Sequence, residues 1–277
     1  MDIDTHNHFW KYNPSEYDWI DGSMSLLKRN YLPEEFSNVL TNAKIGGCIA
    51  VQARQSDAET DWLLKLSDEF KIIKGVVGWV DVCSVNLHEF LEQKHQHHKL
   101  KGFRHVLQGE EDDFMLHPDF IRGIKVLSEH DYCYEILVYE NQLKSVRKLL
   151  DQLPEMRLVI DHIAKPNIKA KPDRDWIQNI KAIALHKHVY CKLSGMVTEA
   201  DWANWTPEII FPFIEHTITC FGENRVMYGS DWPVCLVAAK YNEVKNLLEQ
   251  YLAIHFNNSR DKIFGSNAKE FYRLIDC

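Results

Sequence analysis

The chain has 277 residues, of which 45% are hydrophobic and 26% charged, and its formal net charge is −8. This composition is typical of a soluble globular protein with a sizeable core, and the acidic balance argues against nucleic acid as a partner. No run of about 18 apolar residues appears, and the N-terminus is too acidic for a secretory signal. We therefore expect a cytoplasmic protein that does not enter a membrane. The seven cysteines are scattered and odd in number, which favours free thiols over a disulfide framework.

Short apolar runs of strand character recur along the chain, and each is followed by a helical pattern. The runs are apolar almost throughout, which is typical of strands buried on both faces of a parallel sheet. The eight expected strands are residues 1–6, 47–52, 73–81, 100–106, 132–139, 157–163, 189–195 and 225–231.

Helical patterns separate these runs. Residues 33–43 open with Pro-Glu-Glu, a favourable first turn. Residues 56–70 open with Ser56 and Glu59 in the spacing of a capping box. A short terminal helix at 266–274 is expected to pack against the outside. No Gly/Ser-rich or Pro-rich linker divides the chain, which favours a single domain spanning 1–277. The other expected helices are 84–96, 118–130, 140–152, 173–186, 207–221 and 238–255.

Eight strands alternating with eight helices predict a (β/α)8 barrel, the α/β fold also called a TIM barrel. A doubly wound open sheet is the alternative, but it more often has a glycine-rich loop after its first strand, where this chain has Phe9 and Trp10. In a barrel, functional side chains gather at the carboxyl ends of the strands. Polar residues concentrate at those ends here: His6, His8, Gln52, Arg54, Arg104, His105, Tyr139, Asp161, His162, Lys192, Ser194 and Asp231.

The histidine pair at the end of the first run is the most informative of these groups. His6 and His8 are two residues apart, so a strand points both side chains to the same side. Two imidazoles held this way suit a divalent metal ion or a polarised oxygen. The alternative is two polar residues in an N-terminal turn. The polar, histidine-containing run 94–99 is interpreted as a solvated helix end rather than as a metal site.

Segments along nearly the full length resemble the amidohydrolase superfamily, in its metal-dependent-hydrolase-like branch. The resemblance is strongest to sugar lactonases of the L-fuconolactonase and L-rhamnonolactonase type. That superfamily has His-x-His on its first strand and an aspartate at the end of its eighth, which correspond here to His6, His8 and Asp231. The matching segments are 4–10, 51–54, 59–60, 75–81, 102–108, 161–166, 191–195, 197–202 and 229–234.

The chain departs from the pattern of the binuclear members. The fourth run ends in Arg104 and His105, with no lysine that could be carboxylated, and the fifth run has no histidine. Only His162, on the sixth run, remains of the additional ligands, so a binuclear site is not expected. Two alternatives stay open: one zinc-like divalent ion on His6, His8 and Asp231, or catalysis without a metal.

The resemblance implies that the enzyme is a carboxylic-ester hydrolase. It would open a small sugar lactone, such as L-fuconolactone or L-rhamnonolactone, to the aldonic acid. Lactone opening needs a base to activate water, donors for the developing oxyanion and an acid for the leaving oxygen. We assign Asp231 as the base. The groups expected to assist it are His6, His8 and Arg104, directly or through a metal, with His162 and His105 as further catalytic candidates. The expected substrate-binding residues are Trp10, Gln52, Arg54, Glu59, Tyr139 and Trp232.

Two other functional classes stay open at this point. A zinc-dependent decarboxylase or hydratase of the same superfamily would want a stronger ligand set, including the missing histidine on the fifth strand. A non-catalytic barrel should have lost Asp231 or the histidine pair, and this chain has both. The sequence carries no signal for the oligomeric state.

Overall fold

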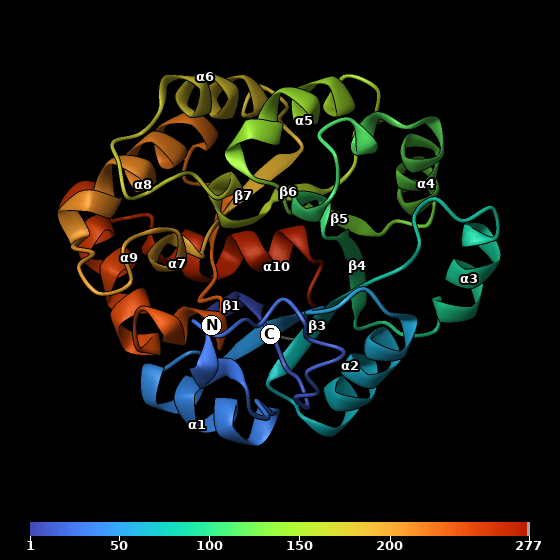
Figure 1. The fold of residues 1–277 in the computed structure, drawn as a ribbon, viewed down its shortest axis with the longest axis horizontal. Coiled ribbons are helices and arrows are strands. Elements are labelled where there is room, and N and C mark those ends of the chain that lie inside the picture. Colours follow the sequence, from blue (N-terminus) through green and yellow to red (C-terminus); the bar gives the residue numbers. More distant parts are fainter. Residues whose placement is uncertain (276–277) are drawn as a thin grey trace.

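The computed structural model describes residues 1–275, which form a ring of parallel strands surrounded by helices (Figure 1). The sheet is eight-stranded, all of its paired neighbours are parallel, and its strands follow the chain order from β1 to β8. The predicted (β/α)8 barrel is therefore confirmed. The strands are β1 (Ile3–Asn7), β2 (Gly47–Val51), β3 (Ile73–Gly78), β4 (Leu100–His105), β5 (Cys133–Ile136), β6 (Leu158–Ile160), β7 (Val189–Leu193) and β8 (Val226–Tyr228).

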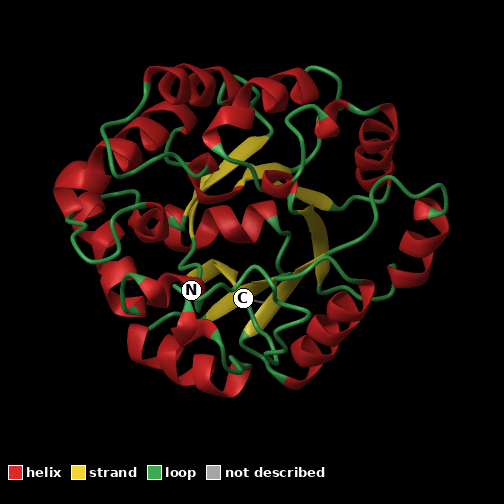
Figure 2. Cartoon of the chain, in the orientation of Figure 1, coloured by secondary structure: helices red, strands yellow, loops and turns green. Residues whose placement is uncertain are grey.

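Helices form the outer layer of the barrel, as the contrast between helices and strands in Figure 2 shows. The main apolar core lies between these helices and the outward-facing strand residues. No described helix is long and apolar enough to cross a membrane. The helices are α1 (Pro33–Ala43), α2 (Asp57–Glu69), α3 (Leu87–Lys94), α4 (Pro118–Glu129), α5 (Leu143–Leu150), α6 (Arg174–Ile183), α7 (Met196–Glu199), α8 (Pro207–Phe221), α9 (Tyr241–His255) and α10 (Asn267–Phe271).

The barrel closes through residues that follow the last strand rather than through β8 alone. The His8 N–H donates to the Trp232 carbonyl at 2.7 Å, and the Asp231 N–H donates to the His6 carbonyl at 2.8 Å. Asn7 and Trp232 form a parallel bridge at the same place. This closure fixes Asp231 directly beside the two histidines of β1.

The terminal helix corrects one expectation. The sequence predicted that it packs against the outside, but α10 lies across the centre of the ring in Figure 1. Phe271 and Tyr272 belong to a second core cluster, together with Ile3, Ile49 and Val159, which start or lie within strands. These strand residues point into the barrel, and two large aromatic side chains close it at the amino-terminal end. The expected external position is therefore wrong, because Phe271 and Tyr272 pack against the inward-facing strand residues.

Most expected strands are shorter in the structure than the apolar runs suggested. The strand expected at 157–163 spans only Leu158–Ile160, because the backbone leaves the strand at Asp161. The short α7 has no counterpart among the expected helices. The six described cysteines are free thiols, as expected, and Cys277 lies outside the described residues.

Candidate active site

A cavity of about 560 Å³ opens at the carboxyl ends of the strands, where the barrel fold is expected to place its functional residues. It is lined by residues from six of the eight strand exits and from the long loop that follows β1. Among the lining residues are His8, Arg54, Arg104, His162, Lys165 and Asp231.

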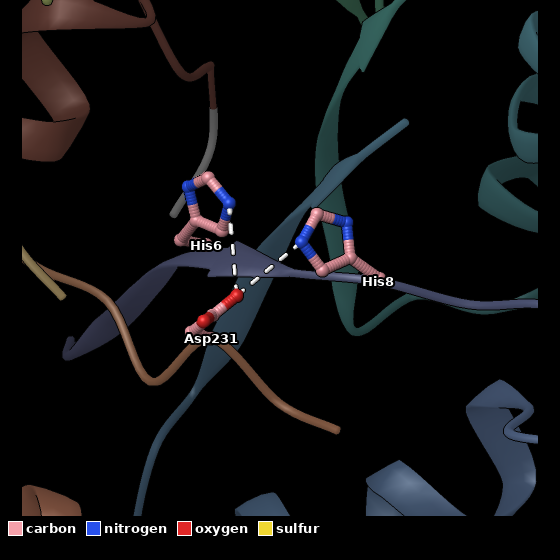
Figure 3. Close-up of side chains that lie close together, drawn as sticks. All are labelled: His6, His8 and Asp231. Atoms are coloured by element: carbon pink, nitrogen blue, oxygen red, sulfur yellow. Dashed lines mark ion pairs between the residues drawn. The ribbon is translucent and has the colours of Figure 1, made fainter. Parts of the chain in front are cut away.

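Figure 3 shows His6 and His8 on either side of Asp231; His8 and Asp231 line this cavity, and His6 is fully buried. The Nε2 atom of His8 lies 3.4 Å from Oδ1 of Asp231, and Nε2 of His6 lies 4.0 Å from the same oxygen. All three side chains are buried to 6% exposure or less. The ring of His162 adds to the cluster, with its centroid 4.3 Å from that of His6. The structure thus brings together residues from β1 and from the exits of β6 and β8.

The hydrogen bonding of His8 bears on whether a metal ion fits here. Its Nδ1 lies 2.8 Å from the Val51 carbonyl, which only accepts, so Nδ1 carries the proton. In the neutral ring, Nε2 is then unprotonated and faces the Asp231 carboxylate with no hydrogen between them. A proton or a metal cation can bridge two lone pairs aimed at one point, and a carbonyl bonded to the far nitrogen is the usual support of a metal-binding histidine. His6, His8 and Asp231 therefore fit a single zinc ion, with a fourth position open.

Arg104 competes with a metal ion for Nε2 of His6. Its Nη1 lies 3.1 Å from His6 Nε2 and donates to Asp161 Oδ2 at 3.0 Å. Its Nη2 donates to the Gln52 carbonyl. A metal ion needs the same lone pair on His6, so metal binding at His6 and this hydrogen bond exclude each other.

A buried charge network lies beside the cluster. The sequence placed its members Asp161 and Lys192 at strand ends without a role, and it did not single out Glu135. The ammonium of Lys192, on β7, pairs with Glu135 on β5 at 2.6 Å and with Asp161 at 3.1 Å. It also lies 3.1 Å from His6 Nδ1, and Tyr272 donates to Glu135 at 2.5 Å. A charged residue inside an apolar strand, as Glu135 is, was the available signal for this network.

Burial and neighbouring charges set the protonation of this network. Burial lowers the pKa of His6 well below its usual value, and the Lys192 and Arg104 charges lower it further. Burial raises the pKa of Glu135 to about 7, against the opposing effect of Lys192. Burial would also raise the pKa of Asp161, but the Lys192 and Arg104 charges outweigh it and hold that pKa below its usual value. His6 is therefore neutral at physiological pH and Asp161 is ionised.

His162 is held by an unusual backbone. Residues 162–165 all have positive φ, between 45° and 63°, a left-handed turn that is costly for side chains other than glycine. The turn ends the strand and points His162 into the cavity, where Nδ1 lies 2.9 Å from the Ser194 hydroxyl. Gly195, with φ of 64°, lies against this ring, and a Cβ there would approach His162 Nδ1 to 2.6 Å.

The remaining predicted residues do not line the cavity, with one exception. Arg54 lines it and pairs with Glu16 at 2.6 Å. The other predicted residues lie in the core or away from the cavity lining. Trp10 is fully buried, and Trp232 stacks on Phe36 with ring centroids 4.4 Å apart. Gln52 is also fully buried, and its side-chain amide donates to the Arg104 carbonyl. Tyr139 is 41% exposed beneath Lys165, and His105 binds Glu110 at 2.8 Å.

Glu59 also lies behind the cavity, and the predicted capping box is wrong. The Glu59 carboxylate accepts the N–H groups of Ala53 and Arg54 at 3.0 and 2.9 Å, and Tyr17 donates to its other oxygen. The loop after β2 turns back over α2. The backbone N–H groups of Ala53 and Arg54 therefore bind the Glu59 carboxylate, which in a capping box would accept the backbone N–H of Ser56. Glu59 thus shapes the loop that carries Arg54.

This position of Glu59 gives a pH-dependent prediction. Burial raises its pKa from 4.5 to about 7, so the folded state holds the proton more tightly than the unfolded state. Its contribution to stability is therefore complete below pH 4.5 and is lost as the pH rises to about 7. We expect Glu59→Gln to unfold like the wild type at pH 4 and to be more stable at pH 8, by on the order of 2 kcal/mol.

Urea denaturation at the two pH values measures this difference. Glu69→Gln, an exposed change at the other end of α2, is the matched control and should keep the wild-type pH dependence. Equal stability of Glu59→Gln and the wild type at pH 8 would contradict the prediction.

Together, the barrel and its cluster define a class of protein: a (β/α)8 hydrolase-type enzyme with an imidazole and carboxylate site suited to one metal ion. The chain belongs to the amidohydrolase family, whose model matches residues 3–274. The predicted superfamily membership is therefore confirmed.

Individual relatives cover almost the whole chain. An L-fucono-1,5-lactonase of Burkholderia multivorans is 39% identical, over 98% of this chain and 96% of the relative. An L-fucono-1,5-lactonase of Burkholderia ambifaria is 28% identical over 98% of this chain and 95% of its own. The crystal structure of an amidohydrolase from Burkholderia multivorans, which contains bound zinc, superposes with a TM-score of 0.95 at 37% identity, covering 99% of this chain and 100% of that chain.

Proposed function

We propose that this protein, acting as one catalytic domain over residues 1–277, hydrolyses sugar lactones to aldonic acids. The observation that carries the proposal is the approach of His6 and His8 to Asp231, with Arg104 Nη1 3.1 Å from His6 Nε2, at a cavity that His8, Arg104 and Asp231 line. The lactonases that resemble the chain over nearly its full length support the same chemistry. Its free thiols and acidic balance support a reducing cytoplasm and a partner other than nucleic acid.

Asp231 is the proposed general base. Its Oδ1 takes a proton from water, and the water oxygen attacks the lactone carbonyl carbon. The bond between that carbon and the ring oxygen then breaks, and Asp231 returns the proton to the ring oxygen. The products are a free hydroxyl and a carboxylic acid, so one water is consumed and all protons are accounted for. His6 and His8, beside the carboxylate, orient the water.

The carbonyl oxygen needs positive charge or hydrogen-bond donors as it becomes an oxyanion. Arg104 Nη1, at the cavity floor, is the proposed donor, and His162 is a second candidate held in place by Ser194. A zinc ion bound by His6, His8 and Asp231 would polarise the carbonyl and acidify water. These residues form the candidate catalytic set in either case.

The charge pattern of the cavity favours a neutral substrate. Three cationic side chains line the cavity among the described residues, and each already has an acidic partner. Arg54 pairs with Glu16 at 2.6 Å, Arg104 with Asp161 at 3.0 Å and Lys165 with Glu199 at 3.5 Å. A dicarboxylate would need unpaired arginines, because each carboxylate is best held by a bidentate fork. Hydroxyl groups of a sugar can share these paired groups as both donors and acceptors.

We therefore expect turnover of neutral aldonolactones, with six-carbon deoxy sugars such as L-fuconolactone or L-rhamnonolactone preferred. Phosphorylated and dicarboxylated lactones should react weakly. A panel of both kinds, assayed by acid release at fixed protein concentration, measures this. A clear preference for the dicarboxylates, or no acid release from any aldonolactone, would overturn the proposal and favour the decarboxylase or hydratase alternative.

A further inference from the structure

A second group of metal-ligating side chains lies far from the barrel mouth, on the outer ring of helices where α3 meets α4 (Figure 1). His88 and Glu92 are one turn apart on α3, and His130 directly follows the last residue of α4. One ring nitrogen from each histidine and one carboxylate oxygen of Glu92 all lie within 4.8 Å of one another.

The two histidines are already close to the spacing that a metal ion requires. His88 Nδ1 and His130 Nε2 are 2.9 Å apart, and the ring centroids are 4.6 Å apart. Two nitrogens bound to one tetrahedral zinc ion lie about 3.3 Å apart, given zinc–nitrogen bonds of about 2.0–2.1 Å. The histidine pair would therefore need to open by only a few tenths of an ångström. Without a metal, the pair can hold only one proton between the facing nitrogens.

The surroundings favour a cation at this position. Oε1 of Glu92 lies 4.0 Å from Nε2 of His88 and 4.0 Å from Nδ1 of His130, the ring nitrogens other than the two that face each other. One nitrogen of each ring still lies within 4.8 Å of a Glu92 carboxylate oxygen. The last carbonyls of α4 also point toward this end, where the helix carries partial negative charge. His130 is held in place with a side chain only 7% exposed, while His88 and Glu92 are 64% and 63% exposed and free to adjust.

We propose that His88, Glu92 and His130 form a binding site for a divalent transition-metal ion such as zinc. We call it the outer site. Its fourth ligand is water, and the bound ion joins α3 to the end of α4. The helix α3 has eight residues, of which only Leu87 and Leu91 are buried, so its own packing is limited. A helix this short is marginal without tertiary support, and a metal link between two helices would supply that support.

The test is a zinc titration of the full-length protein against a chromogenic chelator, with the metal alone as the probe. Asp231→Asn serves as the background, so that the barrel cluster contributes less to the count. We expect the Asp231→Asn protein to bind one equivalent of zinc at the outer site. Adding His88→Gln should weaken the binding of that equivalent by on the order of 100-fold. His97→Gln changes an exposed histidine outside the outer site, in the same helix-end region, and should bind zinc like its parent.

Thermal melting with and without zinc provides a second readout. Zinc should raise the melting temperature of the parent and of His97→Gln more than that of His88→Gln. A separate variant, Glu92→Gln, should also bind zinc more weakly at the outer site. Equal zinc affinity in His88→Gln and its parent, or an equal loss in His97→Gln, would overturn the proposal. None of these outcomes depends on lactone hydrolysis, because the outer site is remote from the cavity.

Discussion

Asp231→Asn is expected to fold normally and to lose about 100-fold or more of its kcat/KM for the preferred aldonolactone. The amide has nearly the same shape as the carboxylate but cannot accept a proton from water, so the transition state loses its base. The measurement is acid release under initial-rate conditions, with circular dichroism to show that the fold is intact. Asp175→Asn changes an exposed carboxylate on α6 and should retain wild-type activity.

A zinc measurement separates the two roles open to Asp231. If this residue acts as the base, the loss in Asp231→Asn persists when zinc is added in excess. Recovery of most activity with added zinc would show that the carboxylate acts chiefly as a metal ligand. Activity within a few-fold of the wild type, in protein with normal folding, would contradict the assignment altogether.

Of all the variants proposed, Lys192→Met is expected to lose the most stability: its free energy of unfolding should fall by about 3–5 kcal/mol. The ammonium is fully buried between Glu135 and Asp161, at 2.6 and 3.1 Å. Methionine fills much of the same volume but leaves two carboxylates without this partner in the barrel centre. Urea denaturation monitored by tryptophan fluorescence gives the free energy directly.

Two further variants make this result specific. Lys144→Met removes an exposed lysine that pairs with Asp175 at 2.7 Å, and it should change stability little because solvent screens that pair. The double variant Lys192→Met with Glu135→Leu should recover part of the loss, because it also removes one uncompensated charge. A loss below about 1 kcal/mol in Lys192→Met would show that the network contributes little to the fold.

The architecture could be predicted because it depends on a repeated pattern. Apolar runs alternate with amphipathic helices, and seven of the eight expected strand exits carry the polar residues named from the sequence, so the barrel and its functional end follow from the sequence. The meeting of His6, His8, Arg104, His162 and Asp231 follows from that same topology. Strand ends were less predictable, since the left-handed backbone at 162–165 begins within an apolar run.

Side-chain direction explains what the sequence could not predict. Trp10 and Trp232 lie near the catalytic candidates in the chain, yet both turn into the core. His105 directly follows Arg104, and neighbouring strand residues point to opposite sides, so only Arg104 reaches the cavity. Glu135 and Lys192 are separated by 57 residues, and their pairing required the strand order and register of the finished barrel.

The paired cations of the cavity have a consequence for turnover. In the proposed reaction a neutral lactone enters and an anionic aldonate must leave. A cavity with free arginines would hold that new negative charge and slow its escape. Because Arg54, Arg104 and Lys165 each face an acidic partner, the anion gains little attraction and meets nearby carboxylates instead. The same arrangement that admits an uncharged sugar therefore favours rapid departure of its hydrolysed form and little inhibition by accumulated product.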